Sequence, residues 1–434
     1  MPLRCNEIKN SDFVDKEVRV RGWVHRLRKQ KENTFILIRD DRGGIIQAIF
    51  PTSKSSILTI ESSIEVIGVL HQDSRAPEGG YEIKGHDLII FSIAQTDFPI
   101  GEYQSPELLL DYRHLALRTR RMVSIAKIRA SVLKFARNWF LTQDWTEITA
   151  PVLVKGAVEG GSTLFKVRYF DEDAYLSQSA QLYLEAMIFC LGPVWSLTPS
   201  FRAEKSRTVR HLAEFSHLEA EAPWVDLEDI LKVQEELVTY IIHNLAKERA
   251  EELNLLKRDI AELKNVQTPF ERMSYDKAIE KLRSAGYKIE IEGSKRTIEW
   301  GDDLSIDSER ALTHEYTNPV FVIGYPLHLK PFYVKQEIGR EGITLSADML
   351  APQGFGEIIS GGIREDVIEV ISKRIKDEGL DPSTYNWYLD LRRYGSVPHG
   401  GFGLGIERLT RWITHIEDIK DTVLFPRTIS RIMP

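Results

Sequence analysis

The sequence predicts a multidomain protein in which a small β domain precedes a larger α+β domain built on an antiparallel sheet. Three observations support this fold class. The 434 residues exceed the ~100–200 that one domain usually holds. Residues 1–100 alternate apolar and polar side chains in short runs, which is typical of strands. Beyond residue 122, stretches of helical periodicity alternate with strand-like and glycine-rich runs, as in α+β domains.

The predicted first domain, residues 1–100, is a small β-barrel or sandwich. Residues 1–60 carry 12 Lys and Arg against 7 Asp and Glu, although the whole chain has a formal net charge of −7. Such an asymmetry favours an anionic partner for this domain, while solubility alone is the other interpretation. Glycine, Asp and Asn separate its strand-like runs: EVRVRGWVHRL, TFILIRD, IIQAIF, SSIEVIGVLHQ and YEIKGHDLIIFSIA.

Residues 101–122 contain prolines and no sustained period, so we expect a linker between the first domain and a second domain over 123–434. Pro151 interrupts a strand-like run and predicts an edge or a bend there, because proline cannot donate to a sheet ladder. Apolar spacing predicts helices over 122–140, 227–263 and 365–376, and strands in VFVIGYP, PFYVKQ and ITLSADMLA.

Composition excludes several classes of protein. No apolar run approaches the ~20 residues of a membrane-spanning helix, and the N-terminus lacks an apolar signal core, which predicts a cytosolic protein. The two cysteines, Cys5 and Cys190, are too few for a disulfide scaffold or a cysteine-rich zinc site. We expect Cys190 to be a small core residue.

The stretch HGGFGLGIERL is the sharpest local motif. It lacks the Lys-Ser/Thr of a phosphate-binding P-loop, and Ile406 stands where a dinucleotide-binding fingerprint needs glycine. Its glycines let a flat ligand lie against bare backbone. Arg408, at the predicted helix start, can stack on a ring and reach phosphate. A tight strand-to-helix packing turn is the alternative interpretation.

Residues 196–222 predict two antiparallel strands joined by a polar loop. Arg202 and Glu204, two residues apart, are expected on one face of the first strand. There Arg202 can neutralise charge developing on a phosphate, Glu204 can accept from an exocyclic amine, and Phe215 can lie under a base. The loop adds three cations for a polyphosphate tail: Arg207, Arg210 and His211.

A third stretch, GEIISGGIRE, offers Glu357 and Ser360. Magnesium prefers such hard oxygen ligands together with water and phosphate. Glu357 alone would be read as a surface carboxylate.

Three elements in order, marked by Pro151, Arg202 and Arg408, resemble the three motifs of the class II aminoacyl-tRNA synthetases. The stretch RGWVHRLRKQKENTFILIRDDRGGIIQAIF resembles the OB-fold anticodon-binding domain of the aspartyl/asparaginyl/lysyl subgroup. The resemblance implies that Phe35 stacks on an anticodon base and that Gln47 reads the central uridine, with Arg28 in the same site. Stacking on an aromatic side chain is a common way to hold an unpaired base.

YLSQSAQLYLEAM resembles the stretch that lines the amino-acid pocket in this subgroup. Leu184 stands where aspartyl enzymes usually carry a lysine that pairs with the substrate carboxylate, and Ala180 where they usually carry proline. The resemblance is therefore closest to asparaginyl enzymes of the archaeal-like type. It implies these contacts to the amino acid: Glu159 (the α-ammonium), Gln178, Gln181, Arg202, Ser360 and Arg364 (the side chain).

The resemblance further implies that ATP and asparagine react on Mg²⁺ to give asparaginyl-adenylate, which is passed to tRNA(Asn). It also implies a homodimer that pairs around Pro151. Arg202 and Arg408 are the implied catalytic residues, and Glu357 and Ser360 the implied magnesium ligands. The implied ATP contacts are Arg202, Glu204, Arg210, His211, Leu212, Phe215, Glu357, Gly405, Glu407 and Arg408.

Three other functions stay open at this stage. An aspartyl-tRNA synthetase is disfavoured by Leu184. A paralogue that makes asparagine through an adenylate would need no anticodon, so the basic first domain disfavours it. A non-catalytic OB-fold nucleic-acid binder would leave the three nucleotide motifs unexplained.

Overall fold

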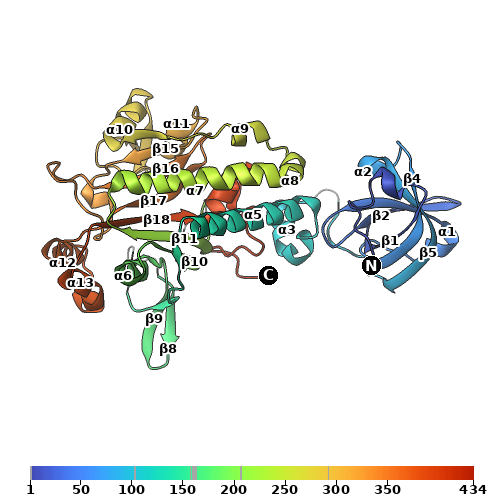
Figure 1. Cartoon of the computed structure of the whole chain (residues 1–434), viewed down its shortest axis with the longest axis horizontal. Helices are drawn as coiled ribbons and strands as arrows, with labels where there is room; N and C mark the ends of the chain where they lie inside the picture. The colour runs from blue at the N-terminus through green and yellow to red at the C-terminus, as the bar shows by residue number, and fades with distance from the viewer. Residues whose placement is uncertain (1, 102–103, 157, 159–163, 206–207, 292) are drawn as a thin grey trace. The chain divides into compact units, whose positions relative to one another are not determined.

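The computed structural model describes residues 2–101, 104–156, 158, 164–205, 208–291 and 293–434. The chain divides into two compact units, Met1–Val123 and Ser124–Met433. Each unit has its own apolar core, and Figure 1 shows the elements of each.

The first unit is a five-stranded closed barrel, with strand order β1-β2-β3-β5-β4, so the barrel is the correct one of the two predicted forms. Period-two alternation sends Val18, Val20 and Val24 of β1 into the core, while Arg19 and Arg21 face outward. Gly85 is required for closure, because a Cβ there would lie 2.1 Å from the buried ring of Phe50. The strands are β1 (Glu17–Lys29), β2 (Asn33–Arg39), β3 (Ile45–Pro51), β4 (Ser63–Gln72) and β5 (Tyr81–Ser92).

Short helices complete this unit. Two of them, α3 and α4, lie in the stretch predicted as a linker. The helices are η1 (Ser11–Phe13), α1 (Thr52–Ser55), α2 (Pro77–Gly80), α3 (Pro106–Asp111) and α4 (Arg113–Ala116).

The second unit is built on an eight-stranded sheet of order β12-β15-β16-β17-β18-β11-β10-β6. Its neighbours are antiparallel except the pairs β12–β15 and β6–β10, which confirms the predicted antiparallel sheet. The strands are β6 (Thr146–Glu147), β10 (Val194–Phe201), β11 (Glu214–Pro223), β12 (Glu271–Ser274), β15 (Val320–Ile323), β16 (Ser346–Ala351), β17 (Gly356–Ile363) and β18 (His399–Gly405).

Pro151 follows the edge strand β6 and ends the run predicted there. The chain then enters a separate three-stranded sheet of β7 (Leu153–Val154), β8 (Lys166–Tyr169) and β9 (Glu172–Leu176). A two-stranded hairpin, β13 (Lys288–Ile291) with β14 (Ser294–Thr297), lies elsewhere in the unit.

Two long helices, α5 (Arg120–Thr142) and α7 (Leu227–Glu248), lie across one face of the large sheet (Figure 1). Their apolar side chains form the main core with the sheet. A capping box between Asp226 and Asp229 starts α7. Phe140 of α5 stacks on the fully buried Trp195 of β10 at 4.6 Å between ring centroids, which fixes the helix against the strand that leads to Arg202.

The remaining helices of this unit lie around the sheet and bring side chains to its ends. They are α6 (Gln181–Leu191), α8 (Ala250–Leu255), α9 (Ile260–Lys264), α10 (Tyr275–Ser284), α11 (Ile306–Thr313), η3 (Leu327–Leu329), α12 (Ile368–Asp377), η4 (Pro382–Tyr385), α13 (Asn386–Arg393), α14 (Ile406–Thr414) and η5 (Ile419–Thr422). Among the described residues, no helix combines the length and apolar character that crossing a membrane requires.

The structure corrects several predicted elements. The helix predicted over 227–263 is three helices, because Arg249 leaves helical geometry and Lys257 takes a left-handed φ of 61°. Residues 331–336 form turns with isolated bridges and no strand. The helix predicted from 365 begins at Ile368.

The prediction that Cys190 is a core residue is wrong. Cys190 is exposed at the end of α6, where Ile188 is the side chain that turns inward.

Candidate active site

A pocket of about 420 Å³ opens in the second unit, over strands β11, β16, β17 and β18. Its lining contains twelve predicted residues: Gln181, Arg202, Arg210, His211, Leu212, Phe215, Glu357, Ser360, Arg364, Gly405, Glu407 and Arg408. Gln178 and Glu204 do not line it. Glu159 and Arg207 lie outside the described residues. The structure therefore brings most of the predicted site together from segments far apart in the sequence.

Cations line one end of the pocket. The Arg202 guanidinium lies 5.7 Å from the centre of the Phe215 ring, and Arg408 Nη1 donates to Glu357 Oε1 at 2.6 Å. Burial, and then the charge of Arg408, lowers the pKa of His211, so this histidine is neutral near pH 7. This end can surround an aromatic ring and an anion.

Arg202 and Glu204, two of the predicted ATP contacts, do not lie on a strand as predicted. Strand β10 ends at Phe201, so Arg202 and Glu204 do not share a strand face as predicted. Glu204 lies at the rim, its Oε2 4.0 Å from His211 Nε2. Arg210 is buried and donates to Glu309 Oε2 at 2.6 Å and to the Glu357 carbonyl at 3.1 Å.

Oxygen ligands suited to magnesium lie together on β16 and β17. Ser360 Oγ donates to Asp348 Oδ1 at 2.6 Å across the two strands, and Glu357 lines the same pocket. Burial alone would raise the pKa of Glu357, but Arg408, Arg210 and Lys330 outweigh it and lower the pKa to about 2. Asp348 is held by Lys330 Nζ at 2.8 and 2.9 Å. Glu357 is therefore an anion near neutral pH.

These residues offer a magnesium ion one or two carboxylates and a hydroxyl, and such a ligand set leaves coordination positions for phosphate and water. Asp348 is a residue that the sequence reasoning missed. Its signal was the pairing of ITLSADMLA with GEIISGG as neighbouring strands, which places Asp348 opposite Ser360. Across the described parts of the chain, no group of three or more His, Cys, Asp or Glu is arranged to hold a metal.

The other end of the pocket holds paired charges. Arg364 Nε donates to Glu221 Oε1 at 3.0 Å, and Nη2 also donates to Glu221. Arg364 is only 4% exposed and Glu221 only 1%. Burial raises the pKa of Glu221 to about 7 against the opposing charge of Arg364. The sequence reasoning found Arg364 but missed Glu221.

Glycines of β18 make room for these side chains. A Cβ at Gly401 would lie 2.2 Å from the Glu221 carboxyl carbon, and one at Gly403 would lie 2.3 Å from His217 Nε2. The bare strand predicted to receive a flat ligand therefore also accommodates Glu221 and His217, which stand on the adjacent strand β11.

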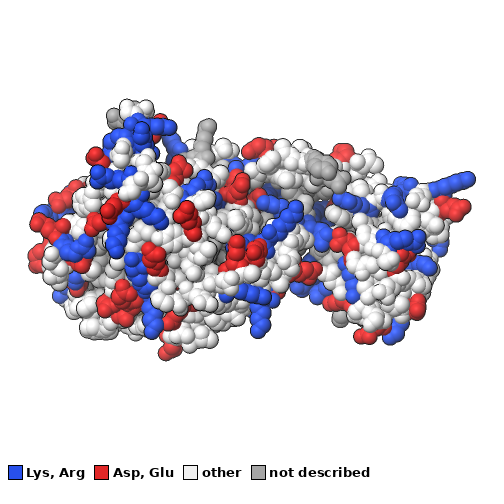
Figure 2. Space-filling model, turned by 90° about the horizontal axis from the view of Figure 1, so that it is seen from above, with Lys and Arg blue, Asp and Glu red and all other residues white. Residues whose placement is uncertain are grey.

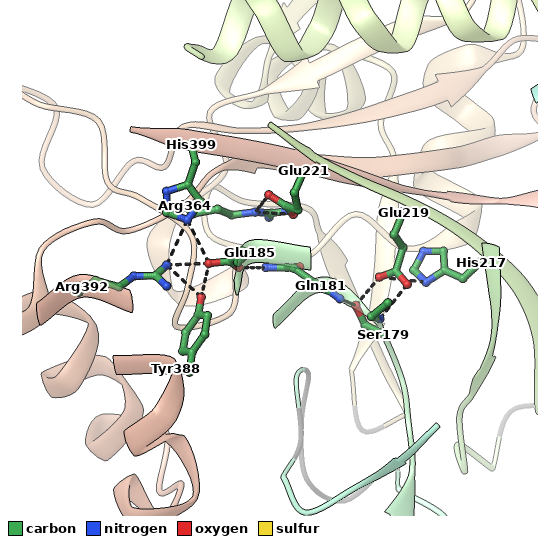
Figure 3. Close-up of polar contacts among 11 residues, drawn as sticks. Ser179, Gln181, Glu185, His217, Glu219, Glu221, Arg364, Tyr388, Arg392 and His399 are labelled. Atoms are coloured by element: carbon green, nitrogen blue, oxygen red, sulfur yellow. Dashed lines mark hydrogen bonds and ion pairs between the residues drawn. The ribbon is translucent and has the colours of Figure 1, made fainter. Parts of the chain in front are cut away.

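Figure 3 shows the hydrogen bonds that support the end of the pocket with Arg364 and Glu221. Ser179 Oγ and the Ala180 N–H both donate to Glu219, which fixes the turn before α6. Behind the pocket, the fully buried Glu185 accepts from Gln181, Tyr388 and Arg392, and it contacts the ring of His399.

Leu184 does not face this pocket, so the role predicted for it is wrong. Leu184 is fully buried and packs with Ala150, Ile188 and Val194. Gln181 and Glu185, four residues apart, occupy the helix face toward the polar cluster (Figure 3). Leu184 instead belongs to the apolar cluster and is absent from the pocket lining.

The first unit has its own pocket, of about 960 Å³. All three residues predicted to bind the anticodon line it: Arg28, Phe35 and Gln47. Arg28 Cζ lies 4.7 Å from the centre of the Phe35 ring, and Gln47 Nε2 donates to Glu82 Oε2 at 2.9 Å. A half-buried ring that lines a pocket beside a guanidinium can hold an unpaired base.

Figure 2 shows Lys and Arg side chains interspersed with Asp and Glu over the face in view. Over the residues that the structure describes, that face therefore carries no broad patch of a single charge sign.

Two family models and full-length relatives match the chain. Residues 105–429 match the family "tRNA synthetases class II (D, K and N)", and residues 18–91 match "OB-fold nucleic acid binding domain". The chain is 50% identical to the asparagine--tRNA ligase of Pyrococcus abyssi over 99% of both chains.

Solved structures are similar over the whole chain. The asparaginyl-tRNA synthetase of Pyrococcus horikoshii complexed with asparaginyl-adenylate is 49% identical, with a TM-score of 0.94 and full coverage of both chains. The asparaginyl-tRNA synthetase of Entamoeba histolytica in complex with the same adenylate is 33% identical, with a TM-score of 0.89 and coverage of 100% and 99%.

We predict that Leu184→Lys destabilises the fold instead of altering ligand choice. An ammonium placed among Ala150, Ile188 and Val194 would have no partner there, and such burial costs at least ~3 kcal/mol. Leu191→Lys, in the same helix but 43% exposed, is the matched control. Urea unfolding measures both. A Leu184→Lys protein as stable as its control would contradict the packing described.

Proposed function

We infer that this chain, which belongs to the class II tRNA synthetases (D, K and N), joins asparagine to tRNA(Asn) in an ATP-dependent reaction through asparaginyl-adenylate. The observation that carries the choice of amino acid is the Arg364–Glu221 pair in the pocket. The pair offers one donor and one acceptor side by side.

A primary amide is the complement of that pair. Its oxygen accepts from Arg364 and its NH₂ donates to Glu221, so both buried groups are satisfied. A carboxylate has no donor for Glu221 and adds a second negative charge beside it. Like charges this close cost several kcal/mol, roughly 4 at the effective dielectric of a protein surface. The pair therefore favours asparagine over aspartate.

An aspartyl-tRNA synthetase remains the rival, and it would need a cation that outweighs Glu221. Leu184 does not supply one, since it is an apolar core residue. The other two alternatives are a paralogue that makes asparagine and a non-catalytic nucleic-acid binder. The chain has a pocket in unit 1 and a nucleotide-sized pocket in unit 2. Neither alternative function would use both pockets, so the pair of pockets supports neither of them.

In the first half-reaction, a carboxylate oxygen of asparagine attacks the α-phosphorus of ATP, and the bond to the β-phosphate bridging oxygen breaks to release pyrophosphate. We propose that Arg202 contacts both the carboxylate and the α-phosphate, with adenine between Phe215 and Arg408. Glu204, at the rim, is proposed to accept from the adenine amine. The enzyme supplies position and charge, and no protein nucleophile is needed.

In the second half-reaction, a hydroxyl of the 3′-terminal ribose of tRNA attacks the asparaginyl carbonyl carbon, and AMP leaves. The remaining predicted contacts are proposals of the same kind. We propose that Arg210, His211, Leu212, Gly405 and Glu407 line the ATP site, and that Glu159, Gln178, Gln181 and Ser360 serve the amino acid.

We propose that Glu357, Ser360 and Asp348 hold Mg²⁺. When bound, the ion screens the phosphate charges and orients the leaving pyrophosphate. Mn²⁺ bound with a non-hydrolysable ATP analogue gives a spin-resonance readout independent of turnover. Retention of that signal in Glu357→Gln would argue against this ligand set.

We predict that Arg202→Ala lowers asparagine-dependent pyrophosphate exchange by at least ~10²-fold, the usual effect of losing one transition-state donor. Arg202→Lys keeps the charge but not the two-pronged geometry, so it should recover only part of the activity. A folded Arg202→Ala protein that exchanges at the wild-type rate would refute the assignment.

We predict that Glu221→Gln lowers the preference for asparagine over aspartate by at least ~10-fold. The charge that repels a carboxylate is gone, and Arg364 is left without its anionic partner. The ratio of kcat/KM values for the two amino acids in pyrophosphate exchange measures it.

The same carboxylate predicts a pH dependence. A Glu221 pKa of about 7 means that the group is mainly ionised at pH 8 and mainly protonated at pH 6. Wild-type discrimination should fall as the pH falls through 7, and Glu221→Gln should abolish the trend. Equal pH profiles of the discrimination ratio in the two proteins would show that Glu221 does not read the side chain.

For the tRNA, we propose that residues 1–100 form the anticodon-binding domain, residues 101–122 a linker and residues 123–434 the catalytic domain. Phe35, Gln47 and Arg28 are the proposed anticodon contacts. The support is that the three line one pocket, where Phe35 presents a ring for stacking.

We predict that Phe35→Ala lowers kcat/KM for aminoacylation of tRNA(Asn) about 5- to 100-fold, the range expected for losing one stacked base. Pyrophosphate exchange should not change, because that reaction needs no anticodon. Phe91→Ala is the matched control, since Phe91 is 57% exposed on the same barrel and lies outside the pocket. Equal aminoacylation by the two variants would exclude Phe35 from the anticodon site.

We also propose a cytoplasmic homodimer. The edge strand β6 pairs only with β10 among the described strands, and Leu141, near it at the end of α5, is 69% exposed. Such an edge suits a two-fold interface. Light scattering that returns a monomer mass at micromolar concentration would exclude the dimer, and recovery in a membrane or organelle fraction would exclude the compartment.

A further inference from the structure

Glu185 is the most heavily hydrogen-bonded side chain behind the amino-acid end of the pocket. It is fully buried, and its two oxygens have different partners (Figure 3). Oε1 accepts from Gln181 Nε2 at 3.0 Å. Oε2 accepts from two donors, Tyr388 Oη at 2.6 Å and Arg392 Nη2 at 2.7 Å, and lies 3.1 Å from His399 Nε2. The other ring nitrogen of His399, Nδ1, donates to the Val397 carbonyl at 2.7 Å.

The carboxylate is ionised. Burial alone would raise the pKa of Glu185, but Arg392, His399 and Arg364 outweigh burial and hold the pKa far below its usual value. An ionised carboxylate accepts hydrogen bonds and donates none. The Gln181 side chain must therefore turn its NH₂ toward Glu185.

This fixes what Gln181 shows to the pocket that it lines. The amide nitrogen and oxygen lie on opposite sides of one planar group. With the nitrogen committed to Glu185, the oxygen is the atom that remains for a ligand. An amide oxygen accepts from ammonium or amide N–H groups, and asparagine carries both.

A second connection runs from the same cluster to Arg364. The ring of His399 contacts Glu185, and the backbone carbonyl of His399 accepts from the Arg364 N–H at 3.0 Å. Arg392 Nε also donates to the carbonyl of Glu365 at 2.9 Å. The cluster thus supports two pocket residues, one by a side-chain bond and one through the backbone.

Stability alone is a weak reason for such a cluster, because replacing a buried ion pair by apolar groups is often neutral or stabilising. What an apolar side chain could not supply is the orientation of Gln181. We propose that Glu185 is a positioning residue that commits the Gln181 amide oxygen to the substrate and so sets the affinity for asparagine. This inference rests on the proposed function and names a residue that has no direct contact with the ligand.

The test is Glu185→Gln. The new amide must place its oxygen toward the two donors Tyr388 and Arg392, because its NH₂ cannot accept from them. Its NH₂ then faces Gln181, which must turn its own oxygen inward and show NH₂ to the pocket. We expect the KM for asparagine in pyrophosphate exchange to rise at least ~10-fold, with the KM for ATP within ~2-fold of wild type.

Two further variants separate positioning from folding. Glu185→Gln with Arg392→Met removes the cation left unpaired by the first change, so it should recover thermal stability and keep the raised asparagine KM. Glu235→Gln is the matched control. Glu235, on α7, is a buried carboxylate that pairs with Arg272 of β12 and does not line the pocket. It should leave the asparagine KM unchanged.

Each outcome decides the proposal. A selective rise in the asparagine KM that persists in the double variant supports it, as does weaker asparagine binding measured calorimetrically without ATP. An unchanged KM, equal rises for both substrates, or recovery in the double variant overturns it. A wild-type enzyme that exchanges no pyrophosphate with asparagine overturns the proposed function first, and this inference with it.

Discussion

The second unit depends on keeping four nearly buried charges paired. Glu185, Glu221, Arg364 and Arg392 are each at most 6% exposed, and any one of them left alone would be costly. Their pairing requires α6, β11, the end of β17 and α13 to meet at one place. Because these elements are far apart in the sequence, the network is satisfied only when the whole unit is folded.

Because of this pairing, the two ends of the pocket differ in the charges that they present. At the nucleotide end, Arg202 and Arg408 stand beside aromatic and carboxylate groups that a polyphosphate and a metal ion can engage. At the amino-acid end, the charges cancel within the protein and leave a donor and an acceptor of fixed position. We propose that a polyanion binds at the first end and that a neutral amide side chain binds at the second.

Much of this could be predicted from the sequence, because strand alternation and the three ordered motifs are local signals. The barrel strands, Arg202, Phe215 and Arg408 follow from such patterns. Glu221 and Asp348 were missed, since their roles depend on which strands become neighbours. Leu184 was misplaced because position in a motif does not tell which face of α6 points to the pocket. Residues 331–336 have a strand-like composition, but their backbone groups bond singly to distant residues, such as Ile363, Glu365 and Arg374, and form no continuous ladder.

The central claim is that the Arg364–Glu221 pair makes the pocket specific for an amide. The most direct measurement is pyrophosphate exchange by the wild-type enzyme with asparagine and aspartate, each supplied alone at equal concentration and pH 8. The account predicts exchange that depends on asparagine, with aspartate at least ~10²-fold less effective, the ratio that corresponds to about 2.7 kcal/mol. Equal or greater exchange with aspartate would contradict it.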